Sequence, residues 1–281
     1  MRCLASLMLL VPLVAAGEVQ PSMSTPQRVV SLNLCTDELL LSLAKPQQIA
    51  SVTWLVKDPT LSWFAAQAQA YPSNHGMAEE IVQMRPDLVL AGTFTTPATL
   101  SLLRRLGIPI TQLEMPTTVM QVKQQIMEVA ALLGRAAYGH EVVLEMERAL
   151  AELPKVPTTS RRPSAVLYQP NGLTAVAGTL VDDVMRIAGL SNLAAIRKLP
   201  NYSRLDMEVL IYAQPQLLIM NNYEQKMPSL AQEMLNHPVF SQAFGASQTV
   251  VVPSQSWSCG TQQIVRAIEI LRIAALEQSP S

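Results

Sequence analysis

Two cysteines, Cys35 in "SLNLCTDELL" and Cys259 in "WSCGTQQIV", have the widest range of chemistry in this sequence. Such residues pair in a disulfide, bind a soft metal ion as thiolates, attack a substrate beside a histidine base, or fill a core. The third cysteine, Cys3, lies in a segment that we expect to be removed. Because Cys35 and Cys259 lie near opposite ends of the chain, any joint role requires a fold that brings those ends together.

Residues 1–16 have the composition of a secretory signal peptide. Arg2 precedes an apolar run from Leu4 to Val14 that is too short to cross a bilayer, and Ala15 and Ala16 supply small residues for cleavage. No later run is long and apolar enough to span a membrane. The sequence therefore predicts export to the periplasm, where the oxidising environment favours pairing of the two remaining cysteines.

Composition limits the class of protein. The chain has 281 residues, of which 49% are hydrophobic and 15% charged, with a net charge of −1. So high an apolar content argues against disorder, and the chain has no excess of positive charge with which to bind nucleic acid. We therefore expect a folded protein of one large or two medium domains that has no nucleic-acid partner.

Short apolar strands alternate with helical segments along most of the chain. "RVVSLNL" (28–34) reads as a strand and is followed by a helical segment at 36–44. A helix at 77–84 precedes a buried strand at 85–92, and a second series of such units begins with a strand at 164–169. Alternation of this kind predicts an α/β fold with mainly parallel sheets.

The second series repeats the first. "VDDVMRIAGLSNLA" (181–194) resembles residues 36–50, and "MEVLIYAQPQLLIM" (207–220) resembles residues 78–91. In the latter pair a glutamate, Glu79 or Glu208, precedes a strand-opening proline by seven positions. The repeat predicts two pseudo-symmetric lobes, residues 27–116 and 160–281, with a cleft between them.

Residues 117–153 separate the lobes. The segment has apolar residues at helical spacing and contains no proline after Pro116 until Pro154. We predict a long interlobe helix, about 50 Å if continuous over 119–152 at 1.5 Å per residue, with Gly134 and Gly139 as possible bends. Such a helix would permit only small closure motions.

The order of these parts resembles the periplasmic substrate-binding proteins of ABC importers that have a helical interlobe backbone, the group that binds ferric siderophores, haem and cobalamin. The resemblance rests on "RVVSLNLCTDELLLSLA", "NHGMAEEIVQMRPDLVLAG", "LDMEVLIYAQPQLLIM" and "VVPSQSWSCGTQQIVRAIEIL". It implies a metal chelate held between the lobes and a membrane permease that meets one glutamate on each lobe. Glu79 and Glu208 match those glutamates, although each also suits the first turn of a helix.

In open α/β sheets, ligands sit beyond the carboxyl ends of the strands, so the strand-end loops should line the cleft. Aromatic rings and neutral polar groups there would suit a large, flat, partly apolar chelate. Trp54 and Trp257 would stack, Tyr168 and Tyr202 would stack or bind iron, and His75 would be an axial ligand or a loop residue. The predicted ligand-binding residues are Asn33, Cys35, Trp54, His75, Tyr168, Asn171, Tyr202 and Trp257.

In this arrangement Cys35 and Cys259 both fall on loops at the cleft edge. A disulfide that tethers the lobes is the first expectation, and a soft-metal-ion receptor using both sulfurs is the alternative function. Three histidines are too few for a receptor of bare zinc or manganese. An exported enzyme with Cys35 as nucleophile would need His75 as its base. We expect no catalysis, no resident cofactor and a monomeric protein.

Overall fold

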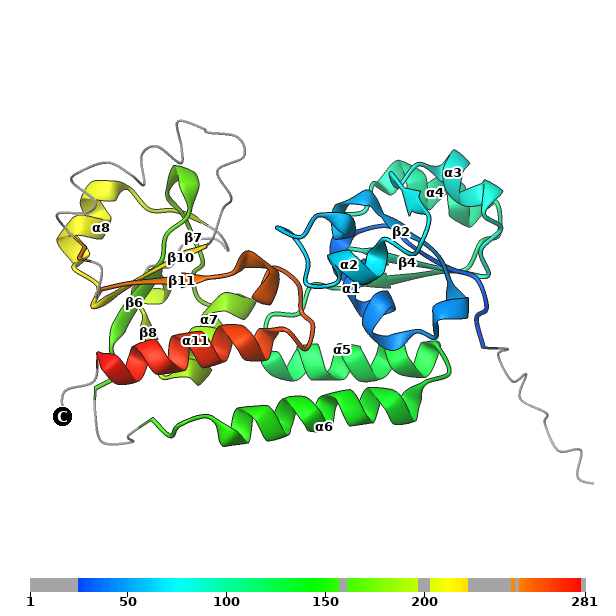
Figure 1. The fold of residues 1–281 in the computed structure, drawn as a ribbon. Coiled ribbons are helices and arrows are strands. Elements are labelled where there is room, and N and C mark those ends of the chain that lie inside the picture. Colours follow the sequence, from blue (N-terminus) through cyan, green and yellow to red (C-terminus); the bar gives the residue numbers. More distant parts are fainter. Residues whose placement is uncertain (1–24, 157–160, 197–202, 222–243, 246–247, 279–281) are drawn as a thin grey trace, which may run out of the picture.

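The computed structural model describes residues 25–156, 161–196, 203–221, 244–245 and 248–278. The predicted signal peptide at 1–16 lies outside these residues. Two parallel sheets stand side by side, each flanked by helices (Figure 1). We call the part that contains the first sheet the first lobe and the part that contains the second sheet the second lobe. No helix of the described residues is long and apolar enough to cross a membrane.

The first lobe contains a sheet with the strand order β3-β2-β1-β4-β5, in which every pair is parallel. Its strands are β1 (Val29–Ser31), β2 (Ile49–Thr53), β3 (Ser73–Asn74), β4 (Leu88–Gly92) and β5 (Ile110–Leu113). Its helices are α1 (Leu34–Leu43), α2 (Ala65–Ala68), α3 (Ala78–Gln83) and α4 (Pro97–Arg105).

The second lobe repeats this topology with the order β11-β10-β6-β8, again parallel. Its strands are β6 (Ser164–Leu167), β8 (Ser191–Asn192), β10 (Leu217–Asn221) and β11 (Thr249–Val252), and its helices are α7 (Leu180–Ala188), α8 (Met207–Ala213) and α11 (Ile264–Glu277). The order β2-β1-β4-β5 therefore corresponds to β8-β6-β10-β11. A small antiparallel pair, β7 (Leu173–Thr174) with β9 (Ser203–Arg204), is added to it.

Alternate residues of the central strands face two different cores, as the two-residue period of a strand requires. In β4, Leu88 and Leu90 face α1, whereas Val89 and Ala91 face α3 and α4. The second lobe repeats the division, because Leu217 and Ile219 of β10 face one core and Leu218 faces α8 in another.

The segment between the lobes is helical, but the prediction of one continuous helix was wrong. It forms α5 (Val119–Leu132) and α6 (Ala136–Glu152), which pack against each other as a hairpin (Figure 1). Gly134 lies between them with φ of +69°, a left-handed conformation that side chains rarely adopt and that ends helices. A hairpin lets α5 pack under the first lobe while α6 returns to the second.

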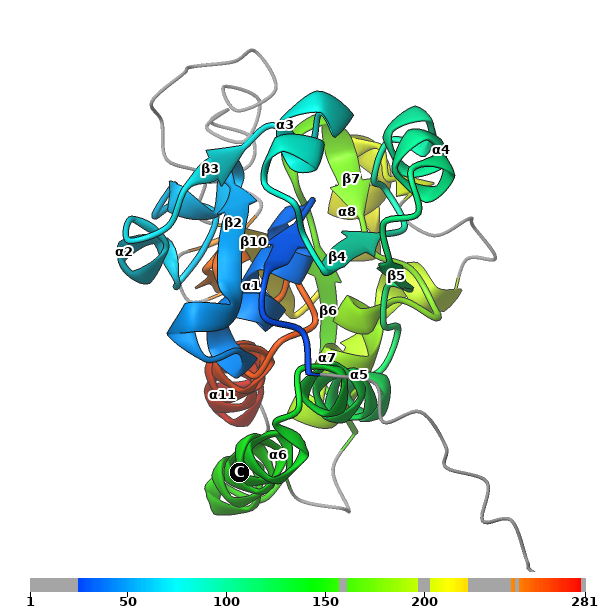
Figure 2. The same cartoon turned by 90° about the vertical axis from the view of Figure 1, so that its right-hand side faces the viewer.

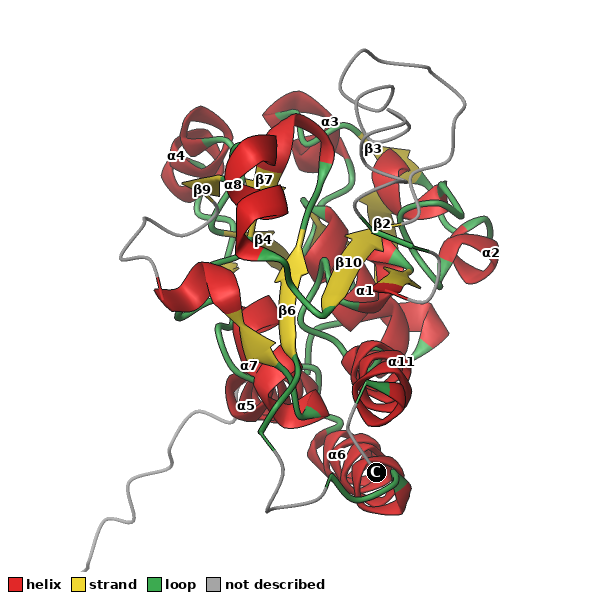
Figure 3. Cartoon of the chain, turned by 90° about the vertical axis from the view of Figure 1, so that its left-hand side faces the viewer, coloured by secondary structure: helices red, strands yellow, loops and turns green. Residues whose placement is uncertain are grey.

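The lobes share one hydrophobic core. A single cluster joins α1 of the first lobe to α7 and α11 of the second through buried residues of α5 such as Val122 and Ile126. Figures 2 and 3 show α5, α6 and α11 together beneath both sheets. Because close-packed cores resist deformation, small closure motions of the lobes stay the prediction for this shared base.

Candidate functional site

A cavity of about 400 Å³ lies between the lobes, within the size range of small-molecule sites. Loops at the carboxyl ends of three strands contribute to it: residues 32–36 after β1, 92–94 after β4 and 113–117 after β5. The second lobe contributes residues 178–180 at the start of α7 and residues 257, 258 and 260. This placement agrees with the rule for ligand sites in parallel α/β sheets.

Most of the lining is apolar. The polar side chains of the described lining are mainly uncharged Asn, Gln, Ser and Thr residues. Glu114 is its acidic residue. The apolar side chains of the described lining are Leu32, Leu34, Leu39, Leu55, Phe94, Leu113, Met115, Pro116, Leu180 and Trp257. A cavity of this composition suits a largely apolar ligand with a few hydrogen-bonding groups.

Asn33 is placed in the lining by its role as the N-cap of α1. Its side-chain oxygen accepts a hydrogen bond from the Thr36 amide at 3.0 Å. The side-chain amide nitrogen of Asn33 lies close to Gly92. A Cβ placed on Gly92 would be 2.1 Å from this nitrogen. The glycine at the end of β4 therefore makes room for the cap.

Trp257 also lines the cavity. It is only 4% exposed, and its indole Nε1 donates to Oδ1 of Asn221 in β10 at 3.1 Å. The hydrogen bond satisfies the one polar atom of the ring and fixes its orientation. Trp257 is thus a rigid aromatic wall supplied by the second half of the chain.

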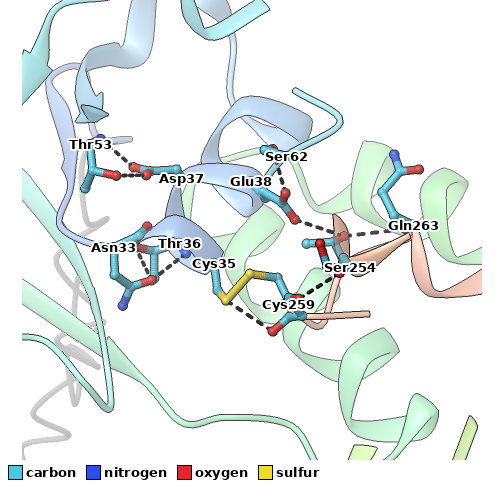
Figure 4. Close-up of a disulfide and its surroundings, with 12 residues drawn as sticks. Asn33, Cys35, Thr36, Asp37, Glu38, Thr53, Ser62, Ser254, Cys259 and Gln263 are labelled. Carbon is cyan, nitrogen blue, oxygen red and sulfur yellow. Dashed lines mark hydrogen bonds between the residues drawn. A yellow bond between two sulfur atoms is a disulfide. The ribbon is translucent and has the colours of Figure 1, made fainter. Parts of the chain in front are cut away.

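Trp257 belongs to residues 254–261, which connect β11 with α11 and which we call the strap. The strap is fastened to the first lobe by the predicted disulfide between Cys35 and Cys259, whose Cα atoms are 5.0 Å apart (Figure 4). The Gln255 amide donates to the Pro59 carbonyl at 2.6 Å, and the Ser254 hydroxyl donates to that of Thr60 at 3.4 Å. With both sulfurs in a disulfide, they are not thiolate ligands for a soft metal ion.

Two buried carboxyl groups, Asp37 and Glu38, lie near the disulfide in the N-terminal half of α1. The Asp37 carboxylate accepts hydrogen bonds from the amide and hydroxyl of Thr53. Glu38 accepts one from the Ser62 hydroxyl at 2.6 Å and one from Thr261 of the strap at 3.5 Å (Figure 4). Burial raises the pKa of Asp37 to about 6 and that of Glu38 to about 7, against the lowering effect of these bonds.

Trp54 and His75 lie outside the cavity lining. The strand β2 ends at Thr53 and continues into a 3₁₀ turn (Trp54–Lys57), from which Leu55 lines the cavity while Trp54 stays 53% exposed. His75 has a side chain that is 62% exposed and lies 3.1 Å from Glu80. Its hydrogen bonds lower the pKa of Glu80. Contact of either residue with a ligand stays a prediction.

The second-lobe residues predicted from the strand-end rule are also outside the lining. Tyr168 is buried in the core beneath α8, and burial raises the pKa of its phenol. Asn171 is exposed with φ of +61°, a conformation that asparagine tolerates better than most residues. Tyr202 lies outside the described residues.

Glu79 and Glu208 occupy equivalent positions in the two lobes. Each is exposed in the first turn of a short helix, α3 or α8, that precedes a central strand, β4 or β10. Both helices lie on the face of their sheet opposite to that covered by the shared core, away from α5 and α6 (Figure 1). The two helices that carry these exposed residues therefore lie on the same side of the molecule.

Residues 93–95, which follow β4, were expected in the lining from the strand-end rule, and Thr93 and Phe94 lie there. Sequence reasoning missed Leu55, Met115 and Leu180, although Met115 follows β5 and the same rule would have located it. Phe94 is highly exposed at the cavity and Met115 partly so, which leaves both accessible to a ligand. Among the described residues, no group of three or more His, Cys, Asp or Glu side chains could hold a metal ion.

Comparison with known proteins places this geometry in context. The model of a family described as periplasmic binding protein matches residues 29–252. A curated cobalamin-binding protein of Halobacterium salinarum is 29% identical over 203 residues, which are 70% of this chain and 54% of that protein. The chain therefore spans about half the length of this relative.

Solved structures share the fold at low sequence identity. The apo form of the periplasmic heme-binding protein RhuT from Roseiflexus sp. RS-1 superimposes with a TM-score of 0.71 at 22% identity, covering 90% of this chain and 98% of that one. The periplasmic vitamin B12-binding protein BtuF of Vibrio cholerae gives a TM-score of 0.65 at 16% identity, with coverage of 90% and 98%. These structures bear out the two-lobed α/β architecture.

Proposed function

This chain belongs to the periplasmic binding protein family, and from that premise we propose that it is the substrate-binding component of an ABC importer for a metal chelate. The chelate is a corrinoid, haem or a ferric siderophore. The observation that carries the proposal is the cavity between the lobes, with its apolar walls and the fixed ring of Trp257. The cobalamin-binding relative makes a corrinoid the first ligand to test.

The cavity supports capture without chemistry. Its lining offers apolar contact and neutral hydrogen-bonding groups, and Cys35, the residue considered as a nucleophile, is held in the disulfide. The protein therefore acts by binding and releasing its ligand and catalyses no reaction. The shared core and the fastened strap favour binding with small changes in the width of the cavity.

Delivery to the permease forms the second part of the proposal. Glu79 and Glu208 are exposed at equivalent positions of the two lobes, so they suit a pair of basic residues on a partner with two-fold symmetry. Exposed charges of this kind steer association and fix orientation more than they add affinity. The mature chain, after removal of residues 1–16, would act in the periplasm as a monomer of two lobes, residues 27–116 and 160–281.

Isothermal titration calorimetry of the mature protein tests the binding proposal. The panel contains cyanocobalamin, cobinamide, haemin and ferric siderophores of several chemical types. We expect saturable binding of one class with one site per chain, reversed by dilution, and recovery of the ligand unchanged. Conversion of the ligand, or no heat with any member of the panel, would contradict the proposal.

A further inference from the structure

Three helices begin at the cavity, an arrangement that by itself would favour an anionic ligand. The helices α1, α5 and α7 start at Leu34, Val119 and Leu180, and residues at or shortly before these starts belong to the lining. A helix N-terminus has unpaired amide groups and a partial positive charge, which together attract anions. Whether a ligand could use them depends on whether other acceptors already occupy them.

At α7 the chain supplies its own acceptors. The hydroxyl oxygen of Thr179 accepts from the Asp182 amide at 3.2 Å, and the Asp182 carboxylate accepts from the Gly178 amide at 3.3 Å. Asp182 and Asp183 both lie in the first turn, where their carboxylates offset the partial positive charge of the helix N-terminus, and Asp183 is also paired with Arg186 at 2.5 Å. The end of α7 that faces the cavity therefore already has a cap and carboxylates of its own.

At the other two helices, side chains of the chain occupy some of the first amides. At α5 the Asp183 carboxylate accepts from the Val119 amide at 2.8 Å, and the Thr118 hydroxyl oxygen accepts from the Gln121 amide at 3.1 Å. At α1 the Asn33 side chain accepts from the Thr36 amide. Asp183 therefore contributes to two helix starts. It lies in the first turn of α7, and its carboxylate accepts a hydrogen bond from the first amide of α5.

The charged side chain of the described lining is negative, like the carboxylates of Asp182 and Asp183 at these helix starts. Glu114, in the loop between β5 and α5, is the acidic side chain of the described lining, which contains no Lys, Arg or His. The Thr93 hydroxyl donates to the Glu114 carboxylate at 3.4 Å, a long contact that leaves the exposed group room to meet a ligand. A carboxylate of a ligand would therefore lose hydration here without gaining a cationic partner from the described lining.

On the premise of the proposed function, we propose that the cavity selects chelates with a neutral or cationic periphery over chelates that carry carboxylates, and that Glu114 discriminates by charge. Corrinoids with carboxamide side chains fit this requirement, because amides take hydrogen bonds without charge. Haem, with two propionates, and anionic ferric siderophores do not fit it. Of the proposed ligands, corrinoids and those ferric siderophores that carry no carboxylate or net negative charge then remain.

Titration calorimetry with corrinoids matched in shape tests the proposal. Aquacyanocobinamide is cationic, dicyanocobinamide is neutral, and dicyanocobyrinic acid has the same macrocycle with carboxylates in place of amides; haemin completes the set. We expect the wild-type protein to bind both cobinamides at least tenfold more tightly than cobyrinic acid and haemin. Glu114→Lys should weaken binding of the cationic cobinamide about three- to tenfold relative to the neutral one, at low salt, as for an exposed charge pair.

Glu141→Lys, which makes the same charge change at an exposed position of α6, is the matched control and should leave this ratio unchanged. Tighter binding of haemin or cobyrinic acid would overturn the charge inference while leaving the proposed function intact. An equal effect of Glu114→Lys and Glu141→Lys would overturn the role of Glu114. No binding by any of the four would contradict the proposed function and this inference with it.

Discussion

Cys35 at the start of α1 and Cys259 in the strap are joined by a disulfide although 224 positions separate them in the sequence. The bond fastens the strap, which follows the last strand of the second lobe, to the first helix of the first lobe. Trp257 lies two residues before Cys259, so the same bond fixes the aromatic wall of the cavity. Under the proposed function, stability and ligand binding are therefore coupled at this position.

Removal of the disulfide should lower stability more than affinity. We expect Cys35→Ser with Cys259→Ser to reduce the free energy of unfolding by about 2–5 kcal/mol, because the bond closes a very long loop in the unfolded chain. Urea unfolding of the mature protein, followed by far-UV circular dichroism, measures the change. Addition of a reductant should destabilise the wild type and leave the double variant unchanged. Two free thiols in the unreduced, denatured wild type would contradict the account.

The buried carboxyl of Glu38 should make stability fall as the pH rises. Its pKa is raised from 4.5 to about 7, so the folded protein holds a proton that the unfolded chain releases between these values. The stability that this proton provides is complete below about pH 4.5 and is lost as the pH passes 7. We expect a loss of about 1–3 kcal/mol between pH 5 and pH 8.

Glu38→Gln isolates this effect, because an amide keeps an acceptor for Ser62 and a donor for Thr261 without ionising. Urea unfolding at a series of pH values should give a flatter profile for this variant, with stability equal to or above that of the wild type at pH 8. Glu128→Gln, at an exposed position of α5, is the control and should keep the wild-type profile. Parallel profiles for wild type and Glu38→Gln would show that Glu38 is not the group responsible.

Gly92→Ala should disturb the cap of α1 and the cavity together. A Cβ at this position would lie 2.1 Å from the Asn33 amide nitrogen, so the Asn33 side chain must move. We expect a loss of about 1 kcal/mol of stability, the usual value of an N-cap, together with weaker ligand binding. If the effect acts through Asn33, Gly92→Ala should have little further effect on stability in an Asn33→Ala protein. If the two substitutions lower stability additively, the effect of Gly92→Ala does not act through Asn33.

Glu79→Ala with Glu208→Ala should separate delivery from capture. The double variant should bind ligand as the wild type does, because both side chains lie outside the cavity, and should fail to stimulate ATP hydrolysis by the reconstituted importer. Glu128→Ala with Glu141→Ala removes the same number of exposed carboxylates from the helical hairpin. This control variant should stimulate ATP hydrolysis as the wild type does. Normal stimulation by the first pair would refute the docking role.

The repeat in the sequence predicted the topology well because it preserves the order of helix and strand. Glu79 and Glu208 each lie in the first turn of a helix before a central strand, as their spacing to Pro86 and Pro215 required. The hairpin of α5 and α6 was harder to predict, since residues 119–152 keep a helical pattern through the turn. Gly134, one of the two glycines expected to bend the helix, has a positive φ, and Leu133 and Arg135 beside it also leave the helical conformation. The sequence pattern did not indicate that this bend would reverse the chain.

Side-chain direction limited prediction of the site. The strand-end rule found the loops after β1, β4 and β11, but the loops after β3 and β6, which carry His75 and Tyr168, lie outside the lining. Whether Trp54 or Leu55 faces the cavity depends on the 3₁₀ turn that begins directly after β2. Asp37 and Glu38 looked like ordinary acidic residues of a first turn. Their burial depends on Thr53, Ser62 and Thr261, which are distant in the sequence and meet them only in the fold.

Single-tryptophan fluorescence tests the central claim, that the cavity beside Trp257 is the ligand site, most directly. Trp54→Phe with Trp63→Phe leaves Trp257 as the sole indole of the chain. Titration with cobinamide should quench this emission saturably, with the affinity that calorimetry gives for the wild type. The complementary Trp257→Phe variant should bind more weakly and respond less. Unquenched Trp257 emission at concentrations where calorimetry detects binding would contradict the claim.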